Sequence, residues 1–218
     1  MEMLAKIYGN NSQLVEVEIT GDNGEVQRKV ITFSDFVSGL TESNVQGDDY
    51  ITIGALPQGY VNGKRSTTCD TTFKCLIRVP KGKKVFMYYD STYVIPFPQL
   101  VFEIEVTCGA VTKSNCFALR DGEDLLSHYP FGNVFSEGRI CWGSTQLPKI
   151  NKMCELDQIV ALFFGSVTND DLYQAGATVA KTEETITQRG LITSLLNKDE
   201  FPQELLVHTK KTLKMLEQ

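Results

Sequence analysis

The sequence predicts an α+β fold, in which an antiparallel β-meander carries helices packed on one face. Segments rich in β-branched and aromatic residues follow one another up to about residue 120, with short polar connections between them. Apolar residues at helical spacing appear only after Pro148. Strands followed by helices, rather than alternating with them, are typical of the α+β class. The 218 residues are 42% hydrophobic and 22% charged, which suits one sizeable folded domain with an extension.

Residues 1–50 predict an N-terminal β-hairpin extension. Leu14–Thr20 alternates apolar and polar residues, which is the period of a half-buried strand. A turn cluster at residues 21–24 follows, and residues 25–33 resume the extended pattern. Residues 39–50 are polar and contain glycine, so we expect a loop there.

Residues 51–165 predict the core, which is built from four extended segments. These segments are residues 72–79, 84–89, 100–107 and 115–119. Connections such as Pro80-Lys81-Gly82 are short, which suits an antiparallel meander. Because proline cannot donate a ladder hydrogen bond, we expect Ile95-Pro96-Phe97-Pro98 at an edge or crossing position.

Three helices are predicted after Pro148. Residues 155–164 carry apolar side chains at helical spacing, and residues 182–197 are compatible with a second helix. Residues 202–216 place four leucines on one stripe, with Pro202 suited to the first helical turn. We expect the helices of residues 166–218 to form a C-terminal extension packed on the core.

The composition argues against nucleic-acid and membrane partners. Lys and Arg number 21 against 27 Asp and Glu, which gives a net charge of −6. The basic residues are scattered, whereas binding to phosphates needs a concentrated basic face. No apolar run reaches the roughly 18 residues that a membrane-spanning helix needs. The N-terminus lacks the pattern of a secretory signal, so we expect a cytoplasmic protein.

Six cysteines, at positions 69, 75, 108, 116, 141 and 154, bear on redox and metal chemistry. An even number could form three disulfides in a secreted protein, but reduced thiols fit a cytoplasmic domain of this size better. The sequence has no Cys-x-x-Cys pair and two histidines, whereas a structural zinc site needs closely paired ligands. We therefore expect no metal site and no cofactor.

The sharpest functional signal lies in residues 129–143, a turn-rich segment between the predicted sheet and the helices. Such connecting segments often carry functional side chains. Cys141 stands here between Ile140 and Trp142, and Asn133 precedes it by eight positions. A thiolate is a nucleophile, and an asparagine amide can donate a hydrogen bond to a developing oxyanion. Cys141 and Asn133 are therefore the candidate catalytic residues, although asparagine is also a common turn residue.

This segment resembles the active-site stretch of ubiquitin-conjugating enzymes, in which His-Pro-Asn is followed by a glycine and then by Ile-Cys. The Asn-to-Cys spacing, Gly138 and Ile140 match that pattern. More closely, the chain resembles the prokaryotic ubiquitin-conjugating-like family D, which includes protein B of the plasmid-borne PRTRC systems. Four ordered motifs within about residues 50–165 carry the resemblance: Ile95-Pro96-Phe97-Pro98-Gln99-Leu100-Val101-Phe102, Cys116-Phe117-Ala118-Leu119, Pro130-Phe131-Gly132-Asn133-Val134 and Gly138-Arg139-Ile140-Cys141-Trp142-Gly143.

The resemblance implies a ubiquitin-conjugating-like fold and a carrier enzyme of a bacterial ubiquitin-like modification pathway. Cys141 would accept the C-terminus of a ubiquitin-like protein from an activating enzyme as a thioester, and pass it to a nucleophile on a possible protein target. Asn133 would stabilise the oxyanion of the second step. The neighbouring residues Trp142, Gly143 and Ser144 are the candidate substrate-binding residues.

The chain departs from the family pattern at two places. Phe131 and Gly132 replace the His and Pro of the wider superfamily, and residues 164–170 lack a histidine that family D tends to carry there. These departures favour an alternative, a catalytically inactive scaffold that binds a modifier or an activating enzyme. A third alternative is a cysteine hydrolase that uses Cys141 with one of the two histidines.

The proposed chemistry sets expectations for the structure. We expect Cys141 to be partly exposed in a shallow groove beside Trp142, and the five other cysteines to be less accessible core residues. Asn133 and Cys141 can reach one carbonyl only if the segment between them folds back. Gly132 and Gly138 would supply the backbone freedom for that fold, since glycine adopts positive φ at no steric cost.

Overall fold

The computed structural model describes residues 2–7, 14–20, 24–37 and 55–217. The chain divides into two compact units, Met1–Thr52 and Ile53–Gln218, and the second unit carries the candidate site. A finer division of the second unit at residue 165 remains a prediction.

The N-terminal unit holds a three-stranded antiparallel sheet in the order β1-β2-β3. Its strands are β1 (Glu2–Ile7), β2 (Leu14–Thr20) and β3 (Val26–Thr32). β2 and β3 pair along their full lengths, as the predicted hairpin requires. β1 was not predicted, because it contains a single β-branched residue. Most of the predicted turn and the loop expected at 39–50 lie outside the described residues.

The larger unit consists mainly of antiparallel strands, with short helices after residue 150. The strands are β4 (Tyr60–Arg65), β5 (Phe73–Val79), β6 (Gly82–Tyr88), β7 (Ser91–Phe97), β8 (Gln99–Thr107), β9 (Ala110–Leu119), β10 (Leu125–Ser127) and β11 (His208–Thr212). The helices are η2 (Met153–Leu156), α2 (Asp157–Phe164), α3 (Gln188–Leu195), η3 (Gln203–Leu205) and α4 (Leu213–Glu217). The four extended segments expected in the core correspond to β5, β6, β8 and β9.

Six strands form one antiparallel sheet in the order β11-β10-β9-β8-β5-β4, while β6 and β7 form a separate two-stranded sheet. Of the four segments expected to form one meander, β5, β8 and β9 are neighbours in the six-stranded sheet, whereas β6 pairs with β7 outside it, so the predicted meander is correct only in part. Pro96 lies in β7 opposite Lys83 of β6. A two-stranded sheet consists of edge strands, so the missing N–H of Pro96 interrupts no interior ladder.

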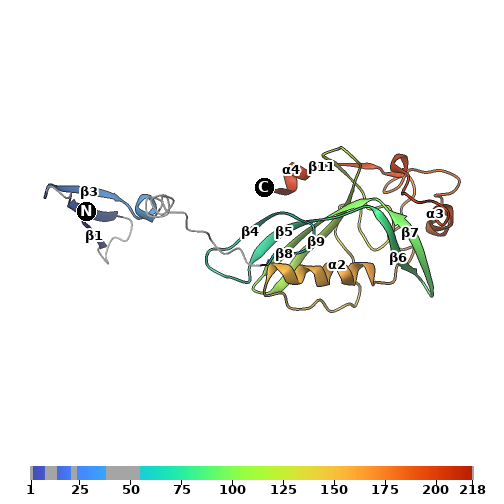
Figure 1. Ribbon diagram of the computed structural model, residues 1–218, viewed down its shortest axis with the longest axis horizontal. Helices are drawn as coiled ribbons and strands as arrows, with labels where there is room; N and C mark the ends of the chain where they lie inside the picture. Colours follow the sequence, from blue (N-terminus) through green and yellow to red (C-terminus); the bar gives the residue numbers. More distant parts are fainter. Residues whose placement is uncertain (1, 8–13, 21–23, 38–54, 218) are drawn as a thin grey trace. The chain divides into compact units, whose positions relative to one another are not determined.

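Side chains of the six-stranded sheet alternate between two apolar clusters, as the two-residue period of a strand requires. On β8, Phe102 and Ile104 belong to a large cluster, while Val101 belongs to a small cluster on the opposite face. α2 packs on the large cluster, whereas Leu213 and Leu216 of α4 complete the small one. Figure 1 shows these two helices on opposite sides of the sheet. The prediction that helices cover one face is therefore wrong, because the sheet is covered on both.

The helix predicted over residues 202–216 is also wrong, since this segment forms η3, β11 and α4 in succession. Its four leucines contact different clusters: Leu205 and Leu206 belong to the large one, and Leu213 and Leu216 to the small one. One straight helix cannot reach both faces of a sheet. Between the two leucine pairs, the chain instead forms β11, which pairs with β10 at the edge of the sheet. Strand pairing therefore overrides the local helical pattern.

The other two helices agree better with the sequence. η2 and α2 together confirm the helix predicted at residues 155–164. α3 occupies the second half of the segment predicted at 182–197. It starts at Gln188 because the Thr187 side chain accepts a hydrogen bond from the Gly190 N–H, which is a typical N-cap.

Candidate active site

Residues 133–141 form a tight hairpin that ends at Cys141. The Cys141 N–H donates to the Asn133 carbonyl at 2.8 Å, and the Phe135 N–H donates to the Arg139 carbonyl at 2.9 Å. Val134 and Ile140 pair between these bonds, and both side chains are buried. The segment therefore folds back as expected, which places the backbone of Asn133 directly beside that of Cys141.

Two glycines make this fold possible for different reasons. Gly138 has φ +102°, and a Cβ at this position would overlap the ring of Phe117. Gly132 does not have a positive φ, contrary to its expected role. It is needed for space instead, because a Cβ there would overlap the Asn169 carbonyl oxygen.

The hairpin is fastened to β9 by backbone and side-chain bonds. The Cys116 N–H donates to the Gly138 carbonyl at 2.8 Å, and the Ile140 N–H donates to the Ser114 carbonyl at 2.9 Å. The Trp142 Nε1–H donates to Ser114 Oγ at 2.8 Å. These bonds position the backbone on both sides of the Cys141 thiol.

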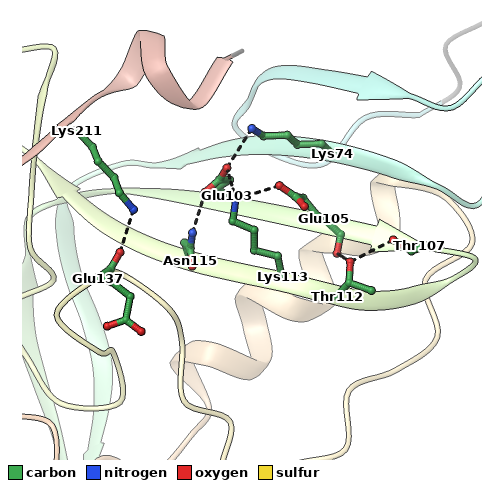
Figure 2. A network of polar contacts seen from close by, with 9 residues as sticks. All are labelled: Lys74, Glu103, Glu105, Thr107, Thr112, Lys113, Asn115, Glu137 and Lys211. Carbon is green, nitrogen blue, oxygen red and sulfur yellow. Dashed lines mark hydrogen bonds and ion pairs between the residues drawn. The ribbon is translucent and has the colours of Figure 1, made fainter.

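The C-terminal strand supports the turn of the hairpin. Lys211 of β11 donates from Nζ to the Glu137 carbonyl at 3.0 Å, a contact shown in Figure 2. The same ammonium lies 4.8 Å from the centre of the Phe117 ring, against which Gly138 packs. His128 lies near the turn as well: burial lowers its pKa, although a hydrogen bond to the Ser136 backbone opposes this.

An open groove of about 1090 Å³ lies beside the hairpin. Its walls come from the segment that starts at Cys141, from α2 and from the loop after α2. The lining residues are Asn133, Cys141, Trp142, Gly143, Ser144, Thr145, Gln146, Pro148, Gln158, Ala161, Leu162, Gly165, Ser166, Val167, Asn169, Asp171 and Leu172. The candidate acceptor, its candidate partner Asn133 and the three candidate substrate-binding residues thus share one groove.

Asn133 connects two walls of the groove. Its backbone has φ +67°, a conformation that asparagine tolerates better than most residues. Its side-chain amide Nδ2 donates to the Val167 carbonyl at 2.9 Å and to Thr168 Oγ1 at 3.3 Å. The amide therefore holds the loop after α2 against the hairpin, and both of its N–H groups are engaged.

Gln188 makes a second connection between the same elements, which the sequence did not reveal. This fully buried side chain accepts a hydrogen bond from the Gly132 N–H and donates to the Asn169 carbonyl at 2.9 Å. Ser114 and Lys211 were missed as well. A polar residue that contacts the site only in the folded structure leaves no local signal in the sequence, and this explains all three omissions.

Neither histidine lines the groove. His208 lies on β11, not on a helix, where Nδ1 is 3.3 Å from Ser127 Oγ and Nε2 is 3.5 Å from a Glu123 carboxylate oxygen. Within the described parts of the chain, Cys141 makes no hydrogen bond to a histidine. The cysteine hydrolase considered above lacks its base in this geometry.

The six cysteines differ in accessibility, but not entirely as expected. Cys75 and Cys116 are buried, and burial raises the pKa of Cys75 to about 12 and that of Cys116 well above its usual value. Cys141 is partly exposed. However, Cys108 is exposed, and Cys69 and Cys154 are partly exposed, like Cys141. The expectation that all five others are core residues is therefore wrong, because Cys69 and Cys108 lie in connections between strands.

Over the described ranges, no group of three or more His, Cys, Asp or Glu side chains is arranged to hold a metal ion. Among the helices of those ranges, none has the length and apolar character needed to cross a membrane.

Comparison with models of protein families gives a match over residues 67–209 to the family described as prokaryotic E2 family D. The chain belongs to prokaryotic E2 family D. This membership confirms the resemblance inferred from the motifs, and links the chain to ubiquitin-like conjugation. The family region extends beyond residue 165 and includes η3 and the start of β11. No curated protein and no solved structure matches the chain.

E2-like proteins in general act with modifiers and activating enzymes. Membership of prokaryotic E2 family D therefore implies protein partners of this general kind. The groove with Cys141 lies wholly within the matched segment.

Proposed function

We propose that this chain is the thioester-forming carrier of a ubiquitin-like modification pathway, and that Cys141 is the acceptor. The observation that carries the proposal is the position of Cys141, partly exposed on a groove and held at the end of a hydrogen-bonded hairpin. Of the described cysteines, Cys141 alone lines that groove. An accessible and well-positioned thiol is what thioester exchange requires.

In the first step, the sulfur of Cys141 attacks the thioester carbonyl that joins the modifier to the activating enzyme. A new carbon–sulfur bond forms to Cys141, the old one breaks, and the departing thiolate takes up the proton that Cys141 gives up. The exchange replaces one thioester by another, so it needs no strong base. This suits a groove that neither His128 nor His208 lines.

In the second step, an amine or hydroxyl attacks the Cys141 thioester, and the thiol of Cys141 is the leaving group. Negative charge develops on the carbonyl oxygen, and a side-chain amide can stabilise it. Asn133 can take this role if one N–H leaves Thr168 Oγ1, the longer of its two bonds at 3.3 Å. In the resting protein, Asn133 acts as a positioning residue for the groove.

The residues after Cys141 suit an extended, glycine-ended tail. Trp142 is fixed by its bond to Ser114 and packs edge-on against Phe163, with ring centres 6.5 Å apart. Gly143 has φ +55°, and a Cβ at this position would meet no atom within 4 Å, so its backbone is open to the groove. Gly143 and Ser144 are both exposed, and we assign them with Trp142 to binding of the modifier tail.

The proposal is tested by incubating the full chain with its activating enzyme, ATP and modifier, followed by non-reducing electrophoresis. We expect an adduct that thiols cleave, and its loss in Cys141→Ser. Cys154→Ser is the matched control, because Cys154 is also partly exposed but does not line the groove. A thiol-sensitive adduct that persists in Cys141→Ser, or disappears in Cys154→Ser, contradicts the assignment.

A second candidate function is an inactive scaffold that binds a modifier or an activating enzyme. The observation in its favour is the engaged amide of Asn133, which leaves no free donor aimed at a Cys141 thioester in the resting state. Calorimetric binding of the modifier together with the absence of any thioester would select this function over the carrier.

A further inference from the structure

Two cysteines outside the groove form a close pair. Cys69 lies in the connection between β4 and β5, and Cys108 lies in the turn between β8 and β9. Their Sγ atoms are 3.8 Å apart. Cys108 is exposed and Cys69 is partly exposed, so the pair lies at the protein surface.

Backbone bonds fix the two connections relative to each other. The Gly109 N–H donates to the Thr71 carbonyl at 2.9 Å, and the Cys108 N–H donates to Thr72 Oγ1 at 3.0 Å. The Thr72 N–H in turn donates to the Cys69 carbonyl at 3.0 Å. The sheet architecture therefore holds the two connections side by side, which brings the two cysteines close together.

Position 108 does not favour a cysteine on packing or backbone grounds. Cys108 and Gly109 have φ +49° and +82°, and they connect the paired residues Thr107 and Ala110 as a two-residue turn. Two positive φ values are typical of a type I′ turn, whose first position favours asparagine, aspartate or glycine. The property that a cysteine contributes here is its sulfur.

The surroundings of Cys69 favour reactivity. Its Sγ lies 3.5 Å from Thr71 Oγ1. Hydrogen bonds from the Thr72 and Thr71 side chains lower the pKa of Cys69 to about 7. A substantial fraction of this sulfur is therefore thiolate at neutral pH, the form that attacks disulfides.

We propose that Cys69 and Cys108 are a redox-modification site, which closes to an intramolecular disulfide on reaction with a small-molecule disulfide such as oxidised glutathione. The Cys69 thiolate attacks one sulfur of the reagent, forms a mixed disulfide and releases one glutathione. The Cys108 sulfur then loses its proton to solvent, attacks Cys69 Sγ and releases the second glutathione. Both protein thiols are oxidised, and one glutathione disulfide is reduced to two glutathione thiols.

The geometry requires little movement for this reaction. A disulfide has a bond length of about 2.05 Å, and the two sulfurs start 3.8 Å apart. The bond would close a loop between residues that are 39 positions apart. Because cross-linking restricts the unfolded chain, we expect the oxidised protein to unfold at a temperature several degrees higher than the reduced protein.

The test treats the full-length protein with buffers of increasing oxidised-to-reduced glutathione ratio, followed by alkylation and peptide mapping by mass spectrometry. We expect a Cys69–Cys108 cross-linked peptide that dithiothreitol reverses, while Cys75 and Cys116 stay reduced. The cross-link should also form in Cys141→Ser, since it does not depend on the proposed carrier function.

Cys108→Asn is the matched control, because asparagine suits the turn and the fold is retained without the second thiol. In this variant we expect glutathione to remain attached to Cys69, since no resolving thiol is present. Cys69→Ser should give neither the cross-link nor that adduct. Stable glutathione adducts on both wild-type cysteines, a cross-link to another cysteine, or no reaction at all would overturn the proposal.

Discussion

The hairpin that carries Cys141 and the turn that carries Cys108 have similar backbone geometry but place their sulfurs in different surroundings. Each places one non-glycine residue in the left-handed region, Asn133 with φ +67° and Cys108 with φ +49°. Within the described residues, the Cys141 sulfur has no hydrogen-bond partner, whereas Cys69 and Cys108 interact with each other and with threonine hydroxyls. The role proposed for Cys141 therefore rests on its position at the groove, while the reactivity proposed for the pair rests on its immediate neighbours.

β9 connects these two regions. It begins directly after the Cys108 turn and continues to Ser114 and Cys116, which hold the Cys141 hairpin. Figure 2 shows a polar network along β8 and β9 on the face that carries α4, from Thr107 and Thr112 to Glu103 and Asn115. The comparison can thus be tested at the hairpin, along the network and at the two left-handed residues.

The largest effect is expected at the hairpin. Gly138→Ala should destabilise the protein by about 2–4 kcal/mol, because alanine is strained at φ +102° and its Cβ overlaps the Phe117 ring. Urea unfolding measures the change. Accessibility of Cys141 to a thiol reagent should change in the same variant, since Gly138 holds the turn.

Gly143→Ala is the control for this prediction. Gly143 also has a positive φ, +55°, but a Cβ there meets no atom within 4 Å. Its cost should be limited to the backbone conformation, about 1 kcal/mol. Equal losses of stability in the two variants would show that the packing of Gly138 on Phe117 contributes nothing.

An intermediate effect is expected in the network between the two regions. Glu103 is buried and accepts bonds from Lys113 at 2.9 Å, Lys74 at 3.0 Å and Asn115 at 2.8 Å. Glu103→Gln should cost about 1–3 kcal/mol, because both lysines lose the charge of their shared partner. Glu105→Gln is the control, since Glu105 is more exposed than Glu103 and pairs with Lys113 but not with Lys74. The loss of stability in this variant should stay within about 0.5 kcal/mol.

The same carboxylate predicts a pH dependence. Burial raises the pKa of Glu103, but the bonds from Lys113, Lys74 and Asn115 lower it more, so the net pKa lies below the usual 4.5. A carboxylate with a lowered folded-state pKa stabilises the protein above its unfolded pKa, and this stability is lost as the pH falls below about 4.5. Unfolding free energies between about pH 7 and pH 3 should therefore decline less steeply in Glu103→Gln than in the wild type. Parallel curves would contradict the charge assigned to Glu103.

The smallest effects, of opposite sign, are expected at the two left-handed residues. Asn133→Ala should lose about 1–2 kcal/mol, because it removes two hydrogen bonds and a residue that tolerates positive φ. Cys108→Asn should gain about 0.5–1 kcal/mol under reducing conditions, since it creates the Asn-Gly pair that type I′ turns favour. Asn133→Gly separates the two contributions at position 133, as it keeps the backbone freedom but not the amide. An increase in stability in Asn133→Ala would contradict the stabilising role assigned to the Asn133 amide and backbone.

Local patterns in the sequence determined four strands of the core (β5, β6, β8 and β9), the helix that contains α2 and the segment that carries the candidate site. Alternating apolar residues identify strands because the backbone alone sets that period. The Asn-to-Cys spacing and Gly138 indicated the fold-back for a similar reason, since a glycine with positive φ at a turn is a local requirement. The family motifs within residues 95–143 are equally local, and the family match confirms them.

Tertiary structure alone decided which side chains meet. The leucine pattern of residues 202–216 predicted one helix. In the structure, two of the four leucines pack on one face of the sheet and two on the other, and β11 lies between the two pairs. Gln188 and Lys211 reach the hairpin across more than 50 residues of sequence, and the pairing of Cys69 with Cys108 depends on β5 lying next to β8. Contacts of this kind depend on the order of strands in the sheet, which the periodicity of a single segment does not encode.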